Sequence, residues 1–253
     1  MSTGVYYVFL KWASTNNAVE AANNGRFMLC FNSRFDADEL FRAMQGLLMA
    51  NRDPLFTVLD RRSPQFWCFT SPEGYGAFWN FQNRNELPQF KNVFSAILLN
   101  DLGGRDWPVI PNPIAGPDWV SGGEFFIRNR RQPSIYWCVY ADDAHLYASD
   151  TRRTKFIVQT TASNLRNPAV MVRDDKVTIQ TIPETIGNVA CDCVSAYVAI
   201  GDPKGNSLTL SNVAYEWKFG GLLNKNVGVK WESDDTARLM HMPLRGGDEW
   251  ELV

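Results

Sequence analysis

The sequence is poor in the residues that most catalytic and metal sites need. Its 253 residues include two histidines, His145 and His241, and five cysteines. Two histidines leave little room for a Ser-His-Asp or Cys-His nucleophile system, and none for a histidine-rich metal site. The cysteine number is odd, and Cys191 and Cys193 enclose one residue where zinc or redox knuckles have two. We therefore expect no disulfide framework, no metal and no cofactor.

The chain also lacks an excess of charge and a long apolar run. Lys and Arg total 25 against 27 Asp and Glu, a net charge of -2, which favours neither nucleic acid nor an anionic membrane as partner. No apolar run approaches the ~18 residues that span a bilayer, and the first residues lack the pattern of a signal peptide. We expect a cytoplasmic protein with no nucleic-acid partner and no membrane insertion.

In the first half, strand-like and helix-like patterns alternate. Asp36 stands three residues before Glu39, the spacing of a capping box, and apolar residues follow at helical spacing. The pattern predicts an α+β domain over residues 1–106 with the order ββαβββα. The elements are strands at 5–12, 26–32, 55–60, 65–70 and 77–81, and helices at 36–51 and 88–101.

The middle of the chain is rich in proline. Residues 107–117 hold four prolines, a composition that disfavours both helices and central strands. We predict a linker over 107–120. Beyond it the helical spacing disappears, and short β-rich runs alternate with turn residues to the end of the chain. The second domain, 121–253, is therefore predicted to contain strands alone.

This second half contains three weakly similar copies, at residues 136–158, 196–220 and 227–253. Each copy has an apolar strand, an acidic turn, a strand with a central leucine, a polar loop and a closing aromatic. The leucines are Leu146, Leu208 and Leu239, and the closing aromatics are Phe156, Trp217 and Trp250. The longer interval between the first two copies must hold an insertion or displaced strands.

This arrangement resembles the repeat of β-trefoil proteins, which include ricin-B-like lectins, fungal fruiting-body lectins and β-trefoil protease inhibitors. The resemblance covers about half the chain. It implies that three copies close a barrel and leave shallow ligand sites in their loops. The fold expected for the whole chain is thus an α+β N-terminal lobe followed by an all-β, β-trefoil-like C-terminal lobe.

The resemblance also implies where a ligand binds. In glycan binders a turn carboxylate accepts sugar hydroxyls while an aromatic face packs on the sugar ring. Asp and Asn are also ordinary turn residues, so each candidate has a structural interpretation as well. Matched by position, the candidates are Trp137, Asp142, Asp143 and His145 in the first copy, Asp202 and Asn206 in the second, and Trp231, Asp234 and Asp235 in the third.

Three functions stay open. The resemblance favours a carbohydrate-binding, lectin-like defence or storage protein, whose partner is a glycan or glycoprotein and which could form a homo-oligomer. The first alternative is a protease inhibitor or toxin-like protein that binds another protein through the same scaffold. The second is a small-molecule enzyme with a pocket between the lobes, lined by Trp67, Trp79 and Trp107.

Overall fold

The computed structural model describes residues 5–13, 25–99, 116–140, 143–163, 169–182, 196–201, 206–231, 237–243 and 246–253. The chain divides into two compact units, 1–118 and 119–253. Of the predicted linker, residues 107–115 lie outside the described part. Asp118 belongs to the first unit, where its carboxylate accepts hydrogen bonds from Arg61 Nε at 2.8 and 2.9 Å. Trp119 begins the second unit.

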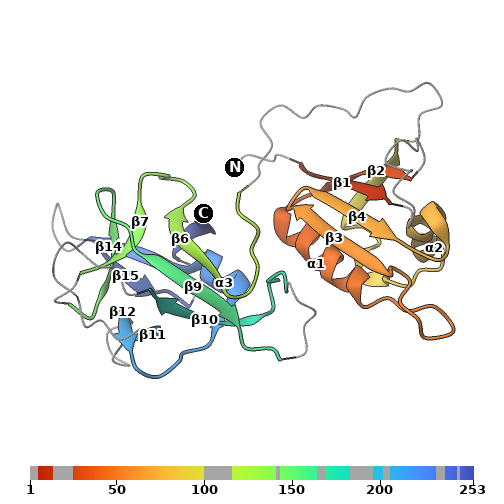
Figure 1. Cartoon of the computed structure of the whole chain (residues 1–253). Coiled ribbons are helices and arrows are strands. Elements are labelled where there is room, and N and C mark those ends of the chain that lie inside the picture. Colours follow the sequence, from red (N-terminus) through yellow and green to blue (C-terminus); the bar gives the residue numbers. More distant parts are fainter. Residues whose placement is uncertain are drawn as a thin grey trace. The chain divides into compact units, whose positions relative to one another are not determined.

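The first unit is a sheet of five strands with helices (Figure 1). Its elements are β1 (Tyr6–Trp12), β2 (Arg26–Phe31), α1 (Arg34–Gln45), β3 (Val58–Ser63), β4 (Phe66–Thr70), η2 (Gly74–Gly76), α2 (Ala77–Asn83), η3 (Pro88–Phe90) and β5 (Phe94–Leu98). The strand order is β3-β4-β1-β2-β5. Strands β1 and β4 are parallel, and the other neighbours are antiparallel.

Alternation along the strands decides which face of this sheet is buried. In β2, Phe27 and Phe31 are buried, whereas the residues between the buried positions are half-buried. The ring of Phe78, from α2, lies 4.9 Å from that of Phe27. The ring of Phe41, from α1, lies 5.0 Å from that of Trp67, whose register places it on the same face. Both helices therefore cover one face of the sheet.

The first helix begins and ends earlier than the sequence pattern predicts. Ser33 is its N-cap, because the Ser33 hydroxyl accepts a hydrogen bond from the Asp36 backbone N–H at 3.3 Å and donates to the Asp36 carboxylate at 2.8 Å. Asp36 is therefore the third helical residue and not the cap. The helix ends at Gln45 rather than at Asn51, with Gly46 as the C-cap, since glycine disfavours helix continuation.

Two predicted elements at the end of the first half are wrong. The expected strand at 77–81 is helix α2, in which Ala77, Phe78 and Phe81 are buried at helical spacing. The expected helix at 88–101 is the short turn η3 followed by strand β5, whose Phe94 stacks on Phe31 at 5.3 Å. A short apolar run such as Phe94–Leu98 is compatible with a helix or a strand, and here its pairing with β2 makes it a strand. The observed order is ββαββαβ instead of ββαβββα.

The second unit consists mainly of strands. Its elements are β6 (Gly123–Asn129), β7 (Tyr136–Val139), β8 (Leu146–Ser149), β9 (Lys155–Thr160), β10 (Lys176–Thr181), β11 (Tyr197–Ile200), β12 (Leu208–Ser211), β13 (Trp217–Lys218), α3 (Phe219–Leu223), β14 (Asn224–Trp231), β15 (Ala237–His241) and β16 (Asp248–Leu252). The helical turn α3 corrects the prediction of strands alone. It forms because one turn of helix buries Phe219, Leu222 and Leu223 together.

Six of these strands form a closed barrel, in the order β6-β7-β8-β15-β14-β16 and back to β6. Strand β6 pairs with β9 along its first half and with β7 at Arg128. From β9 the pairing continues through β10 to β11 and β12, and β13 pairs with β10. The interval between the first two copies thus contains at least one further strand, β10.

Three hairpins, β7–β8, β11–β12 and β14–β15, meet edge to edge in a cycle. Leu146, Leu208 and Leu239 are fully buried and hold the same place in each hairpin. The contacts between the hairpins also involve equivalent positions. In each contact, one residue lies two positions before the buried leucine of its hairpin. Its partner lies two positions after the buried leucine of the neighbouring hairpin. These pairs are Ala144 with Leu210, Asn206 with His241, and Ala237 with Ala148.

The closing aromatics also share one environment, since all three are buried against their own hairpins. The first copy has Phe156, whose ring centroid lies 6.2 Å from that of Trp137. There the Trp137 carbonyl accepts a hydrogen bond from the Thr154 N–H at 3.0 Å. In the other copies the indole Nε1 donates to the corresponding carbonyl, from Trp217 to Val198 at 2.9 Å and from Trp250 to Val227 at 2.8 Å.

Candidate functional site

The loop between β7 and β8 carries a carboxylate on which three donors converge. Asp143 Oδ1 accepts a hydrogen bond from the His145 backbone N–H at 2.9 Å, and it lies 2.7 Å from Nδ1 of the His145 ring. Asp143 Oδ2 accepts a hydrogen bond from the Tyr147 hydroxyl. These three residues are called the Asp143 cluster below. Two of them, Asp143 and His145, are among the site residues predicted from the sequence.

The cluster fixes the charge of its carboxyl group. Hydrogen bonds from the Tyr147 hydroxyl and from His145 lower the pKa of Asp143 to about 2. The carboxylate is nevertheless accessible, because 34% of the Asp143 side chain and 32% of the His145 side chain are exposed. Burial and the neighbouring Asp143 raise the pKa of Tyr147. At neutral pH the site therefore presents a fixed, ionised acceptor beside a protonated tyrosine.

Aromatic rings and cations surround the cluster. The ring of Tyr140 lies 5.1 Å from that of Tyr147, edge to face. The Arg152 guanidinium lies 5.0 Å from the Tyr140 ring centroid, and the Arg238 guanidinium lies 5.9 Å from that of Tyr147. Arg238 belongs to β15, so the third copy contributes to the surroundings of a site in the first copy.

Trp137 does not take part in this site, and its assignment as a ligand-binding residue is wrong. Its side chain is fully buried, and its ring lies 5.6 Å from the ring of Trp250. A ring with no exposed face cannot stack on a sugar. The sequence places Trp137 close to Asp143, but in β7 it points into the core. Its neighbour Asp142 lies outside the described residues.

In the second copy, the predicted site residue Asn206 makes a backbone hydrogen bond. Asn206 has a φ of 51°, in the left-handed region that asparagine tolerates better than most residues. Its carbonyl accepts the His241 N–H at 2.6 Å, the hydrogen bond that joins the second hairpin to the third. The positive φ and this backbone contact give Asn206 a structural role, and ligand binding by its side chain stays a prediction. Asp202 lies outside the described residues.

The third copy exposes a tryptophan. Trp231 ends β14 and is 59% exposed, the highest exposure of any described tryptophan. It faces Ala237 across the hairpin and precedes the loop with Asp234 and Asp235, which lie outside the described residues. An exposed indole face is the kind of surface on which a sugar ring packs. Ligand binding by Trp231 therefore stays a prediction.

The geometry of the Asp143 cluster favours binding over catalysis. A histidine beside a carboxylate is the arrangement that orients a general base in hydrolases. Here, however, the Tyr147 hydroxyl bonds to the carboxylate and not to the imidazole. Burial raises the pKa of the nearby Cys138 thiol to about 11, whereas a cysteine nucleophile needs a thiolate near neutral pH. The cluster is thus best suited to accept hydrogen bonds from a ligand.

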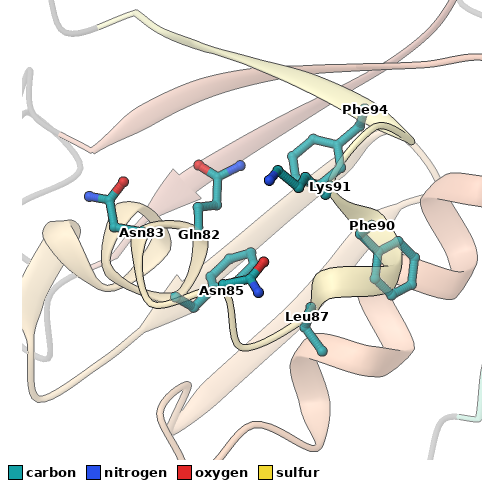
Figure 2. A pocket seen from close by; sticks show the side chains of 8 residues that line it. Gln82, Asn83, Asn85, Leu87, Phe90, Lys91 and Phe94 are labelled. Atoms are coloured by element: carbon teal, nitrogen blue, oxygen red, sulfur yellow. The ribbon is translucent and has the colours of Figure 1, made fainter.

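The first unit contains a separate groove of about 580 Å³ between α2, η3 and β5 (Figure 2). Its lining includes the apolar side chains of Phe81, Leu87, Phe90 and Phe94. Gln82 also lines it, and its buried Oε1 has no hydrogen-bond partner among the described residues. Trp67, expected in an enzyme pocket, lies instead in the core of the unit, where its Nε1 donates to the Pro64 carbonyl at 3.2 Å. Trp107 is outside the described residues.

Tyr140, Tyr147 and Arg238 are neighbours of Asp143 that the sequence pattern did not predict. The sequence does carry a signal for Tyr147, since residues two apart in a strand share a face and His145 is a predicted site residue. No such signal existed for Arg238, which is 95 positions from Asp143 in the chain. It approaches only because β15 pairs with β8.

Comparisons with known proteins leave the family open. No protein-family model matches the sequence, and no curated protein matches it. In the described part of the chain, no helix has the length and apolar character needed to cross a membrane. The same residues contain no group of three histidine, cysteine, aspartate or glutamate side chains placed to hold a metal ion.

Proposed function

We propose that the second unit is a β-trefoil lectin domain that binds carbohydrate through the Asp143 cluster. The cluster supplies an acceptor for sugar hydroxyls, and the half-buried Tyr140 supplies the aromatic ring beside it. Trp231 marks a second ligand-binding position on the third copy.

The cycle of the three hairpins supports the trefoil part of this proposal. Each hairpin meets the next through residues at equivalent positions, as expected for three copies around one axis. Strands β6, β9, β10 and β13 pair in succession, and β14 pairs with β16, which pairs with β6. Helix α3 lies between β13 and β14 in the chain and packs against both strands.

The observation that carries the binding proposal is the exposed, ionised carboxylate of Asp143. A sugar presents neighbouring hydroxyl donors, and a carboxylate is a strong acceptor for them. Three protein donors hold this carboxylate in place before a ligand arrives, so little ordering is required on binding. A carboxylate has about four acceptor positions, which leaves one for a ligand hydroxyl.

A glycan-array screen followed by titration calorimetry tests the proposal. The substitution Asp143→Asn keeps an acceptor for the His145 N–H but removes the charge. A lost charge-assisted hydrogen bond costs about 1.5–3 kcal/mol, so affinity for the best array hit should fall about ten- to a hundredfold. Circular dichroism should show an unchanged fold.

Asp150→Asn is the matched control, because Asp150 is an exposed residue just beyond β8. Its affinity for the glycan should equal that of the wild type. Equal affinity in Asp143→Asn would refute the assignment of the site, and Trp231→Ala would then test the third copy. Absence of any array hit would refute carbohydrate binding and favour a protein partner.

A further inference from the structure

Strand β5, at one edge of the first sheet, lacks the usual protection of an edge strand. Residues 92–100 contain no charge, proline or glycine. Ile97 and Leu98 are 46% and 41% exposed. Sheet edges are normally blocked by charges, prolines or bulges. The opposite edge, β3, has such protection, with a bulge between Arg61 and Ser63 and charged side chains at Asp60 and Arg62.

The backbone of β5 has a regular set of outward-facing groups. The Leu99 N–H donates to the Arg26 carbonyl of β2 at 2.8 Å. Because neighbouring residues of a strand direct their amides to opposite sides, Phe94, Ala96 and Leu98 direct theirs away from β2. Of the described residues, only those of β2 pair with β5. A second strand can therefore add at this edge without disturbing the sheet.

We propose that β5 pairs antiparallel with β5 of a second copy of this chain, so that two first units share one continuous sheet. The two-fold axis passes at Ala96, so that Ala96 of one chain faces Ala96 of the second chain. Phe94 of each chain then faces Leu98 of the other. All outward-facing amides and carbonyls of the strand are then paired. No like charges meet, because residues 92–100 carry none.

The groove of the first unit favours a second copy over an unrelated strand. Phe94 lines this groove together with Leu87 and Phe90 (Figure 2). Phe94 and Leu98 lie on the same, helix-covered face, since they pair with Phe31 and Phe27. In the antiparallel arrangement, Leu98 of the second copy lies opposite Phe94 at the border of the groove. One strand thus provides both the open edge and the apolar side chain that fits beside it.

Analytical ultracentrifugation of the full chain over a range of concentrations tests this dimer. Wild type should sediment as a dimer of the 28.7 kDa chain. Ala96→Pro removes an outward-facing N–H at an edge position where proline is tolerated. It should raise the dimer dissociation constant at least about tenfold, for loss of a hydrogen-bonded pair at the axis. Val58→Lys, on the exposed β3 edge, should leave the constant unchanged.

A second variant tests the dimer independently, in case Ala96→Pro does not fold. Ile97→Lys alters an exposed side chain and places two like charges diagonally across the axis, so it should also weaken the dimer. Hydrogen exchange at the Phe94 and Leu98 amides should be slower in wild type than in either variant, and exchange at the Ala96 amide should be slower in wild type than in Ile97→Lys. A monomeric wild type at every concentration would overturn the proposal. So would a dimer that persists in the folded variants, or one that Val58→Lys disrupts equally.

Discussion

At the residue scale, burial separates two tryptophans that the sequence treats alike. Trp137 and Trp231 both precede an acidic turn, yet the first is fully buried and the second is 59% exposed. Trp137 pairs across its hairpin with Ala148, and Trp231 pairs across its own hairpin with Ala237. Because Ala148 and Ala237 pair with each other, the four residues form one row across four strands. One row of residues therefore runs from the core to the surface, and only its exposed end can contact a ligand.

The Asp143 cluster makes a prediction at the same scale. Tyr147→Phe removes the donor that contributes most to the low pKa of Asp143, so this pKa should rise from about 2 toward the ordinary value of about 3.9. Carboxyl NMR titration measures the change directly. A pKa that stays near 2 in the variant would show that His145 alone holds the charge.

The same shift gives a dependence of stability on pH. Because the folded-state pKa is depressed, the carboxylate stabilises the fold above the unfolded pKa of about 3.9. That contribution is lost as the pH falls through the folded value of about 2. Denaturant unfolding of wild type and Tyr147→Phe should therefore differ at neutral pH and converge in strong acid.

At the scale of the element, the closing aromatics link each hairpin to the strand that follows it. The indole N–H groups of Trp217 and Trp250 satisfy buried carbonyls of Val198 and Val227. In the first copy a backbone N–H satisfies the corresponding carbonyl, so a phenylalanine suffices there. The difference between the copies in sequence thus follows from which donor reaches this carbonyl.

Trp250→Phe tests that explanation. The substitution preserves an aromatic ring but leaves the Val227 carbonyl without its donor, which should cost about 1–3 kcal/mol of unfolding free energy. Chemical denaturation provides the measurement. Trp231→Phe, at an exposed position, is the control and should change stability by less than about 0.5 kcal/mol. A loss in the control equal to that in Trp250→Phe would contradict the explanation.

At the scale of the whole molecule, the second unit closes on itself. Its first strand, β6, pairs with its last, β16, and the Trp119 indole donates to the Leu252 carbonyl at 3.3 Å. The fragment 119–253 should therefore fold alone, since a unit with its own core has the property of a domain. We expect a β-type circular dichroism spectrum and one cooperative thermal transition.

Glycan binding by this fragment should match that of the full chain, because the Asp143 cluster and its neighbours all belong to it. Its sedimentation should differ, since the strand proposed to form the dimer belongs to the first unit. A fragment that is unfolded under conditions where the full chain is folded would show that the second unit depends on the first.

The amino-acid sequence by itself determined the strand-rich character of the second half and its three copies, because alternation and repetition are local patterns. It also selected Asp143 and His145 together as candidate site residues, since they are two positions apart in the first copy. Only the tertiary structure decided that residues 94–98 form a strand, that Trp137 is buried, and that Tyr147 and Arg238 flank the carboxylate. These outcomes depend on strand pairing between distant segments, and a local pattern does not specify which partner a strand will find.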